Sequence, residues 1–203
     1  MNGNSLNEIG ATTNPLSASD IIYSIATDES EGTVYAGGAF TDSSGSTYVI
    51  KWDGSNWSKL GTGNNGINVQ GQINALATYV DGFVYAACNN SGFIYIAKWN
   101  GSSWTQLGTG GNPLLGLRGT VSSLVVDAAG IVFIAGSFTI ENRPAYVARW
   151  DGNSWVALYS PSQTSSALAG INCLAVDNAD NLYAGGAFLV NDTAQNIIAK
   201  YKY

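Results

Sequence analysis

The sequence predicts an all-β fold, a β-propeller of four four-stranded blades with about 50 residues in each blade. Three observations predict it. The chain repeats itself four times, each repeat holds short segments rich in β-branched and aromatic residues, and Gly, Asn, Asp and Ser cluster between those segments. No repeat has the 3.6-residue periodicity of an amphipathic helix, which excludes a helical solenoid. A single sheet with two apolar faces cannot bury both, whereas radial stacking of such sheets does.

The predicted strands follow one another in the same order in every repeat. The innermost strand comes first, at 22–27, 73–78, 121–126 and 171–176. The second strand, VYAGGAF in the first repeat, lies at 34–40, 84–90, 132–138 and 182–188. The third strand lies at 48–52, 95–99, 146–150 and 197–201, and the fourth at 57–61, 104–108 and 155–159. The expected blades of this single domain span about 20–63, 71–110, 119–160, and 169–203 together with 1–10.

The last repeat has no fourth strand after residue 201, and the N-terminal segment supplies a candidate. MNGNSLNEIG aligns with WDGSNWSKLG, so that Leu6 falls on Trp57 and Gly10 on Gly61. Pairing of 1–10 with the last repeat would complete that blade and remove the open strand edges of the ring. Two assemblies fit: one chain closes as a four-bladed ring, or two chains exchange terminal strands in an eight-bladed ring.

One position of the innermost strand carries only small side chains, namely Ser24, Ala75, Ser123 and Cys173. Small side chains suit strands that converge near an axis, which favours the four-bladed monomer over the strand-exchanged dimer. The two cysteines of the chain, Cys88 and Cys173, lie in different repeats and are expected to be free thiols. The pairs Gly37–Gly38 and Gly185–Gly186 have no predicted helix behind them, so we expect close strand approach there rather than phosphate binding.

The pattern YAGGAF followed by YVIKWDGSNWSKLGTG, at 35–40 and 48–63, resembles repeats of propeller proteins from bacterial surfaces and large DNA viruses. It is distantly similar to kelch repeats, from which it departs because Tyr48 and Trp52 are closer together than the kelch Tyr and Trp. The resemblance covers essentially the whole chain and implies a propeller. It implies little about activity, because such propellers serve in adhesion, sugar binding, scaffolding and catalysis alike.

Composition excludes several classes of partner. The net charge is −6 and there are only 8 Lys and Arg residues, so a nucleic-acid partner is not expected. No apolar run is long enough to cross a bilayer, so membrane insertion is not expected either. The segment MNGNSLNEIG lacks the basic start and apolar centre of a signal peptide. We therefore expect an intracellular chain, a virion-associated chain, or an excised segment of a surface protein.

A pair of tryptophans flanks the last turn of three repeats: Trp52/Trp57, Trp99/Trp104 and Trp150/Trp155. Residues that flank a four-residue hairpin loop lie on the same face, so each pair is expected to pack together and hold the hairpin in register. The alternative is a repeated platform on which a sugar ring stacks. Its candidate ligand-binding residues are Trp57, Trp104 and Trp155.

Three aspartates follow the innermost strand at one repeat position: Asp28, Asp127 and Asp177. They are expected to be turn formers that accept hydrogen bonds from their own backbone. They are also weak candidates for a cation site, with Ca²⁺ as the natural ion for oxygen ligands. Because no dense acidic calcium-loop motif is present, we expect no metal and no other cofactor.

Catalysis is not expected. The chain contains no histidine, which removes the usual general base, the usual zinc ligand and the Ser–His dyad. Two functions stay open. The first is a structural or protein-interaction module of a virion or surface assembly, with contacts through loops such as 41–47, 140–145 and 189–196. The second is a multivalent lectin-like binder whose carbohydrate sites lie between blades.

Overall fold

The structure is a computed structural model of the 203-residue chain, and it describes residues 8–10, 16, 18–28, 30–62, 66–67, 69–108, 117–159, 170–190 and 193–201. Strands dominate it, and no α-helix occurs in these ranges, which confirms the predicted all-β class. The one helical turn is a 3₁₀ turn, η2 (Val80–Gly82). Within the described residues, the structure contains no helix with the length and apolar character needed to cross a bilayer.

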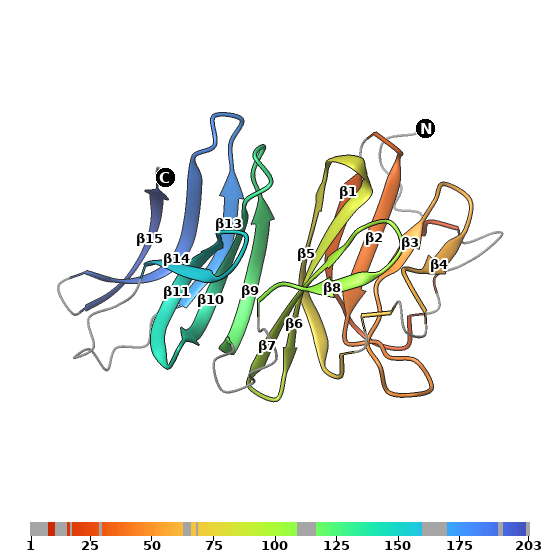
Figure 1. The fold of residues 1–203 in the computed structure, drawn as a ribbon, viewed down its shortest axis with the longest axis horizontal. Helices are drawn as coiled ribbons and strands as arrows, with labels where there is room; N and C mark the ends of the chain where they lie inside the picture. Colours follow the sequence, from red (N-terminus) through yellow and green to blue (C-terminus); the bar gives the residue numbers. More distant parts are fainter. Residues whose placement is uncertain are drawn as a thin grey trace.

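Every repeat forms an antiparallel sheet whose strands pair in sequence order (Figure 1). Repeat 1 forms β1 (Ile22–Asp28), β2 (Thr33–Gly38), β3 (Ile50–Trp52) and β4 (Trp57–Lys59). Repeat 2 forms β5 (Gln72–Tyr79), β6 (Phe83–Asn90), β7 (Phe93–Trp99) and β8 (Trp104–Gln106). Repeat 3 forms β9 (Arg118–Val126), β10 (Val132–Ile140), β11 (Arg143–Trp150) and β12 (Trp155–Tyr159). Repeat 4 forms β13 (Gly170–Val176), β14 (Leu182–Val190) and β15 (Thr193–Tyr201).

The last hairpin of the first three repeats shows why Asp-Gly and Asn-Gly recur there. In repeat 1 the Asp53 carboxylate accepts hydrogen bonds from the backbone N–H groups of Ser55 and Asn56, at 2.9 and 2.7 Å. The following Gly54 has a φ of 95°, a left-handed conformation that favours glycine. The same turn recurs after Asn100 and Asp151. In each hairpin the Asp or Asn side chain and the glycine after it define the turn, and this turn places the two tryptophans opposite each other.

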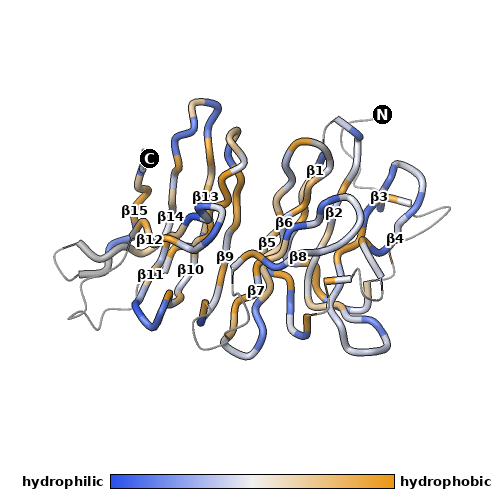
Figure 2. The backbone as a smooth tube through the Cα atoms, viewed as in Figure 1, coloured by the Kyte–Doolittle hydropathy of each residue, from blue (hydrophilic) through white to orange (hydrophobic). Residues whose placement is uncertain are grey.

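The core contains three apolar layers, each between two consecutive repeats, and a smaller buried cluster of Ala36, Phe40 and Ile50 within repeat 1. The first layer joins residues of repeat 1, such as Val49 and Leu60, to Ile73 and Leu76 of repeat 2. Equivalent layers join repeats 2 and 3 and repeats 3 and 4. Apolar residues run along the strands and hydrophilic residues gather at many of the connecting turns (Figure 2). Burial thus depends on stacking of neighbouring sheets, as the repeat pattern predicts.

The sheets follow one another from one end of the molecule to the other and do not close into a ring (Figure 1). Repeat 1 lies at one end of the described structure and repeat 4 at the other. The single bridge between Phe93 and Arg118 joins repeats 2 and 3 into one continuous eight-stranded sheet. The predicted number of four blades in a closed ring therefore stays a prediction. Of the predicted completing strand 1–10, residues 1–7 lie outside the described residues.

Two of the small residues of the innermost strand bond to the next repeat. The Ser24 hydroxyl accepts a hydrogen bond from the Leu76 N–H of the next repeat at 2.9 Å, and Ser123 accepts one from Leu174 N–H at 3.0 Å. Small side chains at this position therefore allow neighbouring innermost strands to approach closely. The preference for four blades over eight stays a prediction.

Candidate functional site

Each tryptophan pair packs ring on ring across its hairpin. The ring centroids of Trp52 and Trp57 are 5.3 Å apart, and the two ring planes make an angle of 48°. The other two pairs have separations of 5.8 and 5.4 Å and angles of 52°. Both distance and tilt lie in the range that favours aromatic packing. The expected pinning of the hairpin register is therefore present in all three repeats.

The second tryptophan of each pair also bonds to the preceding repeat. Trp104 Nε1–H donates to the carbonyl oxygen of Leu60 at 2.8 Å, and Trp155 Nε1–H donates to that of Leu107 at 3.3 Å. Trp57 has no complete repeat before it, yet its Nε1–H donates to the carbonyl oxygen of Ile9 at 3.2 Å. Ile9 thus occupies, beside repeat 1, the place that a fourth strand occupies beside the next repeat. This position agrees with the alignment of 1–10 with fourth strands.

The indoles proposed as ligand platforms are consequently half-buried parts of the seams between repeats. Gly108 lies so close to the next pair that a Cβ there would be 2.7 Å from a ring carbon of Trp150. With their N–H groups bonded across the seam, Trp57, Trp104 and Trp155 could offer a sugar only the uncovered part of a ring face. Sugar stacking on these residues stays a prediction.

The three aspartates that follow the innermost strands lie one repeat apart and act in their own turns. Asp177 is typical: its carboxylate accepts hydrogen bonds from Ala179, Asn181 and Tyr183. The bond from the Asn181 backbone N–H is the main reason why the pKa of Asp177 falls to about 2. Asp28 and Asp127 are buried in equivalent turns. Among the described residues there is no group of three or more acidic or cysteine side chains that could hold a metal ion.

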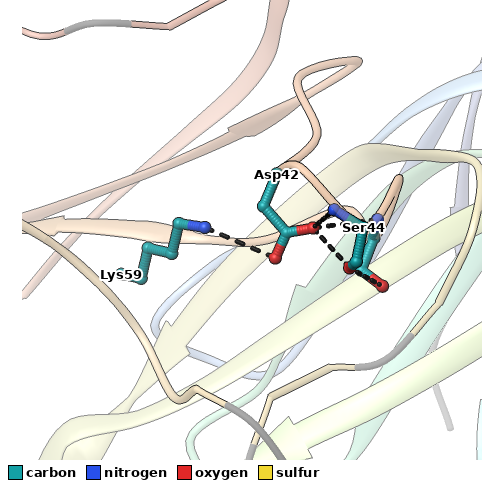
Figure 3. Close-up of polar contacts among 4 residues, drawn as sticks. Asp42, Ser44 and Lys59 are labelled. Atoms are coloured by element: carbon teal, nitrogen blue, oxygen red, sulfur yellow. Dashed lines mark hydrogen bonds and ion pairs between the residues drawn. The ribbon is translucent and has the colours of Figure 1, made fainter.

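The segment 41–47 contributes to a polar cleft in repeat 1. Repeat 1 has a long connection between its second and third strands, whereas two residues connect β6 to β7 and β10 to β11. The Asp42 carboxylate holds this connection by accepting hydrogen bonds from the Ser44 N–H and hydroxyl, and it forms an ion pair with Lys59 at 3.4 Å (Figure 3). The Ser44 hydroxyl is the main cause that lowers the pKa of Asp42 to about 2.

The Lys59 ammonium also lies 4.2 Å from the centre of the Tyr48 ring, in cation–π contact. Tyr48, Asp42 and Lys59 line a cleft of about 130 Å³. It is too small for most drug-sized ligands, which occupy roughly 300 Å³ or more. A monosaccharide edge or a single side chain of a partner matches its volume better.

The other two loops expected to carry contacts are mostly strand. Within 140–145, β10 and β11 pair as far as Ile140 and Arg143, and only Glu141 and Asn142 form the turn, with φ of 51° and 63°. Within 189–196, β14 extends to Val190 and β15 begins at Thr193. The loop prediction was wrong for both segments, because strands cover most of each one. At 141–142 the reason is a two-residue turn in the left-handed region, which lets the strands continue almost to its tip.

The two ends of the molecule expose apolar sheet surface. At the repeat 1 end, Ile22, Tyr23 and Ile25 of β1 are exposed. At the repeat 4 end, Ile197 and Ile198 of β15 are exposed, and they line an open groove of about 480 Å³ together with Cys173, Gly185 and neighbouring residues. We refer to these as the repeat 1 face and the repeat 4 face. Sequence reasoning missed both, because every repeat carries the same apolar pattern and only tertiary structure shows which copy lacks a neighbour.

A cation–π contact between the second and third strands recurs in several repeats, and the sequence analysis did not predict it. Lys98 of β7 lies 3.9 Å from the centre of the Phe83 ring and 5.6 Å from that of Tyr85, its cross-strand neighbour. Lys51 and Lys200 make the equivalent contacts with Tyr35 and Tyr183. The signal was present in the sequence, since each third strand carries Lys or Arg at this position. These contacts link the second and third strands of a repeat.

Comparison with known proteins shows the fold alone. No family model matches the chain, and no curated protein sequence matches it. The extracellular domain of BT4673 from B. thetaiotaomicron superposes with a TM-score of 0.53 at 15% identity, over 91% of this chain and 22% of that one. YCF48, solved with a D1 peptide, superposes with a TM-score of 0.54 at 14% identity, over 85% of this chain and 52% of that one. This chain therefore spans about a fifth and about half of these two proteins, and both likenesses support a β-propeller-type fold.

Proposed function

We propose that the chain is a non-enzymatic structural or protein-interaction module, a part of a virion or surface assembly. The observation that carries the proposal is the pair of exposed apolar faces at the two ends of the stacked sheets. Contiguous apolar surface of this kind is a mark of protein–protein contact sites. YCF48, a structural neighbour, is recorded with a peptide bound, which is in keeping with a binding role for such a fold.

The state of the carboxylates supports a non-enzymatic role. A carboxylic acid that works as a general acid near neutral pH needs a raised pKa. The pKa values of Asp42 and Asp177 are instead lowered to about 2, because hydrogen bonds from their own turns stabilise the charged form. The pKa values of Asp53 and Asp151 are lowered for the same reason. These carboxylates stabilise turns by accepting hydrogen bonds.

Ring closure is the second part of the proposal. The segment 1–10 supplies the fourth strand to a sheet that has three strands in the described structure, β13–β15. The bond from Trp57 to Ile9 supports this, because fourth strands accept the equivalent bond in the later repeats. The closed ring has four blades if the segment comes from the same chain and eight if it comes from a second one.

Carbohydrate binding is the alternative function, and one observation favours it. The cleft beside Tyr48 combines an aromatic side chain with the carboxylate of Asp42 and the ammonium of Lys59, the groups that a sugar hydroxyl and ring edge would use. In this alternative, Trp57, Trp104 and Trp155 are secondary stacking sites at the seams.

A glycan screen decides between the two functions. The chain is applied to a glycan array at high micromolar concentration, and any hit is titrated while tryptophan fluorescence is recorded. The interaction proposal expects no saturable binding. Saturable binding that Tyr48→Ala or Trp104→Phe abolishes, in a variant that keeps the wild-type circular dichroism spectrum, would refute the proposal and establish the lectin alternative.

A further inference from the structure

In repeats 1 to 3, the third strand carries one apolar residue that the next repeat covers. Val49, Ile96 and Val147 occupy this position in repeats 1 to 3, and all three are buried. Ile198 occupies it in repeat 4 and is 80% exposed, against 1% for Ile96. The side chains are of similar size and polarity, so the difference comes from the missing neighbour.

The first strand shows the reverse asymmetry, because here it is the preceding repeat that provides cover. Ile73, Val121 and Ile171 are buried, whereas the equivalent Ile22 of repeat 1 is 41% exposed. The difference in exposure is larger at a second equivalent position, where Leu76 of repeat 2 is 6% exposed and Ile25 of repeat 1 is 67% exposed. The repeat 1 face therefore lacks a preceding repeat, just as the repeat 4 face lacks a following one.

The seam between repeats 1 and 2 shows how the two kinds of face fit together. Ile73 and Leu76 lie against Gly37 of β2, where an added Cβ would be 2.6 Å from Ile73 Cγ2 and 3.3 Å from Leu76 Cδ1. The expected role of Gly37 in close approach is thereby confirmed. The equivalent glycine of repeat 4 is Gly185, which borders the open groove beside Ile198. The side chains that would fill this groove by the same contacts are Ile22 and Ile25.

We infer that the repeat 4 face binds the repeat 1 face of a second copy of this chain, head to tail. The inference rests on the proposed interaction function and names its partner. One copy cannot fill its own groove in the observed arrangement, since repeats 1 and 4 lie at opposite ends of the molecule (Figure 1). Two copies joined at both ends form a ring with two-fold symmetry and two identical seams. Such a ring has eight blades, within the range of about four to eight that propellers use, whereas three copies would exceed it.

Other contacts continue across the same seam. In the internal seams, Ser24 and Ser123 accept hydrogen bonds from the first strand of the following repeat. Cys173 holds this position in repeat 4 and is exposed, so in the ring it lies beside the backbone of the partner's first strand, at the position of Ile25. The ring thereby buries Cys173 along with the two apolar faces.

Cys173 is a native reporter of this seam. The only other cysteine, Cys88, is fully buried, and burial raises the pKa of its thiol to about 12, so it stays unreactive while the chain is folded. We expect the reaction of Cys173 with a thiol reagent to slow by about tenfold or more as protein concentration rises, because only dissociated chains react. Native mass spectrometry and light scattering, both under reducing conditions, are expected to give twice the chain mass of 21.2 kDa.

Charge variants test the head-to-tail geometry. Ile25→Glu alone and Ile198→Lys alone each place a charge in both seams of a symmetric ring, so each variant is expected to be monomeric, with fast-reacting Cys173. An equimolar mixture of the two forms a ring with one wild-type seam and one Glu–Lys seam, and dimer mass is expected to return. Val80→Glu is the matched control: Val80 is 60% exposed on a turn outside both faces, and this variant is expected to dimerise normally.

Several results would overturn the inference. They are a monomer at every concentration with freely reactive Cys173, a monomer with protected Cys173, an assembly larger than two chains, and a variant mixture that stays monomeric. A monomer with protected Cys173 would mean closure within one chain. None of these results bears on the glycan screen, so failure of the second-copy inference is distinguishable from failure of the proposed interaction function.

Discussion

The strongest test of the repeat stacking compares one substitution at two equivalent positions. Ile73→Ala and Ile22→Ala remove the same atoms from the same place in two successive repeats. Ile73 is fully buried against repeat 1, whereas Ile22 has no repeat before it. Any difference between the two variants therefore measures what the neighbouring repeat contributes. Both are made in the Ile198→Lys background, which prevents association of chains from covering Ile22.

The magnitude follows from the burial of each side chain. Ile→Ala removes three carbons, which at about 0.8 kcal/mol per buried CH₂ gives about 2.4 kcal/mol of lost transfer free energy. The rigid seam around Ile73 closes only partly, so we expect Ile73→Ala to lower the free energy of unfolding by about 3–4 kcal/mol. At Ile22 roughly half of this transfer term applies and no cavity forms, so the expected loss is about 1 kcal/mol.

Urea unfolding followed by tryptophan fluorescence measures both values, because indoles occupy the seams of repeats 1 to 3. The two variants should have the same m-value, so that a shift of midpoint reports stability alone. Losses that agree within about 0.5 kcal/mol would refute the reasoning, since burial of Ile73 by repeat 1 would then contribute nothing measurable.

Three further predictions follow from other contacts. Trp104→Phe removes the N–H that donates to the Leu60 carbonyl oxygen at 2.8 Å, so it should lower the free energy of unfolding by about 1–2 kcal/mol. An unchanged urea midpoint would contradict a role for this bond in the seam. Gly37→Ala overpacks the seam beside Ile73 and should destabilise by about 1–3 kcal/mol; combined with Ile73→Ala it should lose less than the sum of the two, and strict additivity would argue against the contact. Asp177 has a folded-state pKa of about 2 against an ordinary 3.8, so the unfolded chain binds more protons as the pH falls below about 4, and the stability from this carboxylate is lost between about pH 4 and pH 2. Thermal unfolding of Asp177→Asn should accordingly show a shallower acid decline than wild type, and an identical decline would show that another group dominates.

Much of the fold was readable from the sequence because its determinants are local. The hairpin before Trp57 follows from Asp53 and Gly54, which supply a hydrogen-bond acceptor and a left-handed backbone whatever the rest of the chain does. The tryptophan pairs were expected to pack together because they flank such turns, and they do. The loop at 140–145 was wrongly predicted, because polar residues near the two-residue turn at 141–142 resemble a longer loop in sequence. The loop at 189–196 was also wrongly predicted, because β14 and β15 cover most of it.

The candidate sites were less predictable. The tryptophans singled out as ligand platforms bond across seams, a contact between residues about one repeat apart that their spacing does not reveal. The cleft at 41–47 depends on Lys59, which the pairing of β3 with β4 brings to Asp42 and Tyr48. The sequence showed that Ser24 and its equivalents are small. It did not show the hydrogen bonds that Ser24 and Ser123 accept, because the donors belong to the next repeat.

Local sequence patterns were enough to predict an all-β chain of four repeats, the position of most strands, and the turns that join them. These properties depend on alternation, turn residues and periodicity, which act over a few residues. Stacking of the sheets determines that Ile96 is covered while Ile198 is not, and that Leu76 is covered while Ile25 is not. Equivalent residues in different repeats have similar local sequence, but their burial depends on whether a neighbouring repeat packs against them. The two open faces are therefore visible only once the sheets are stacked.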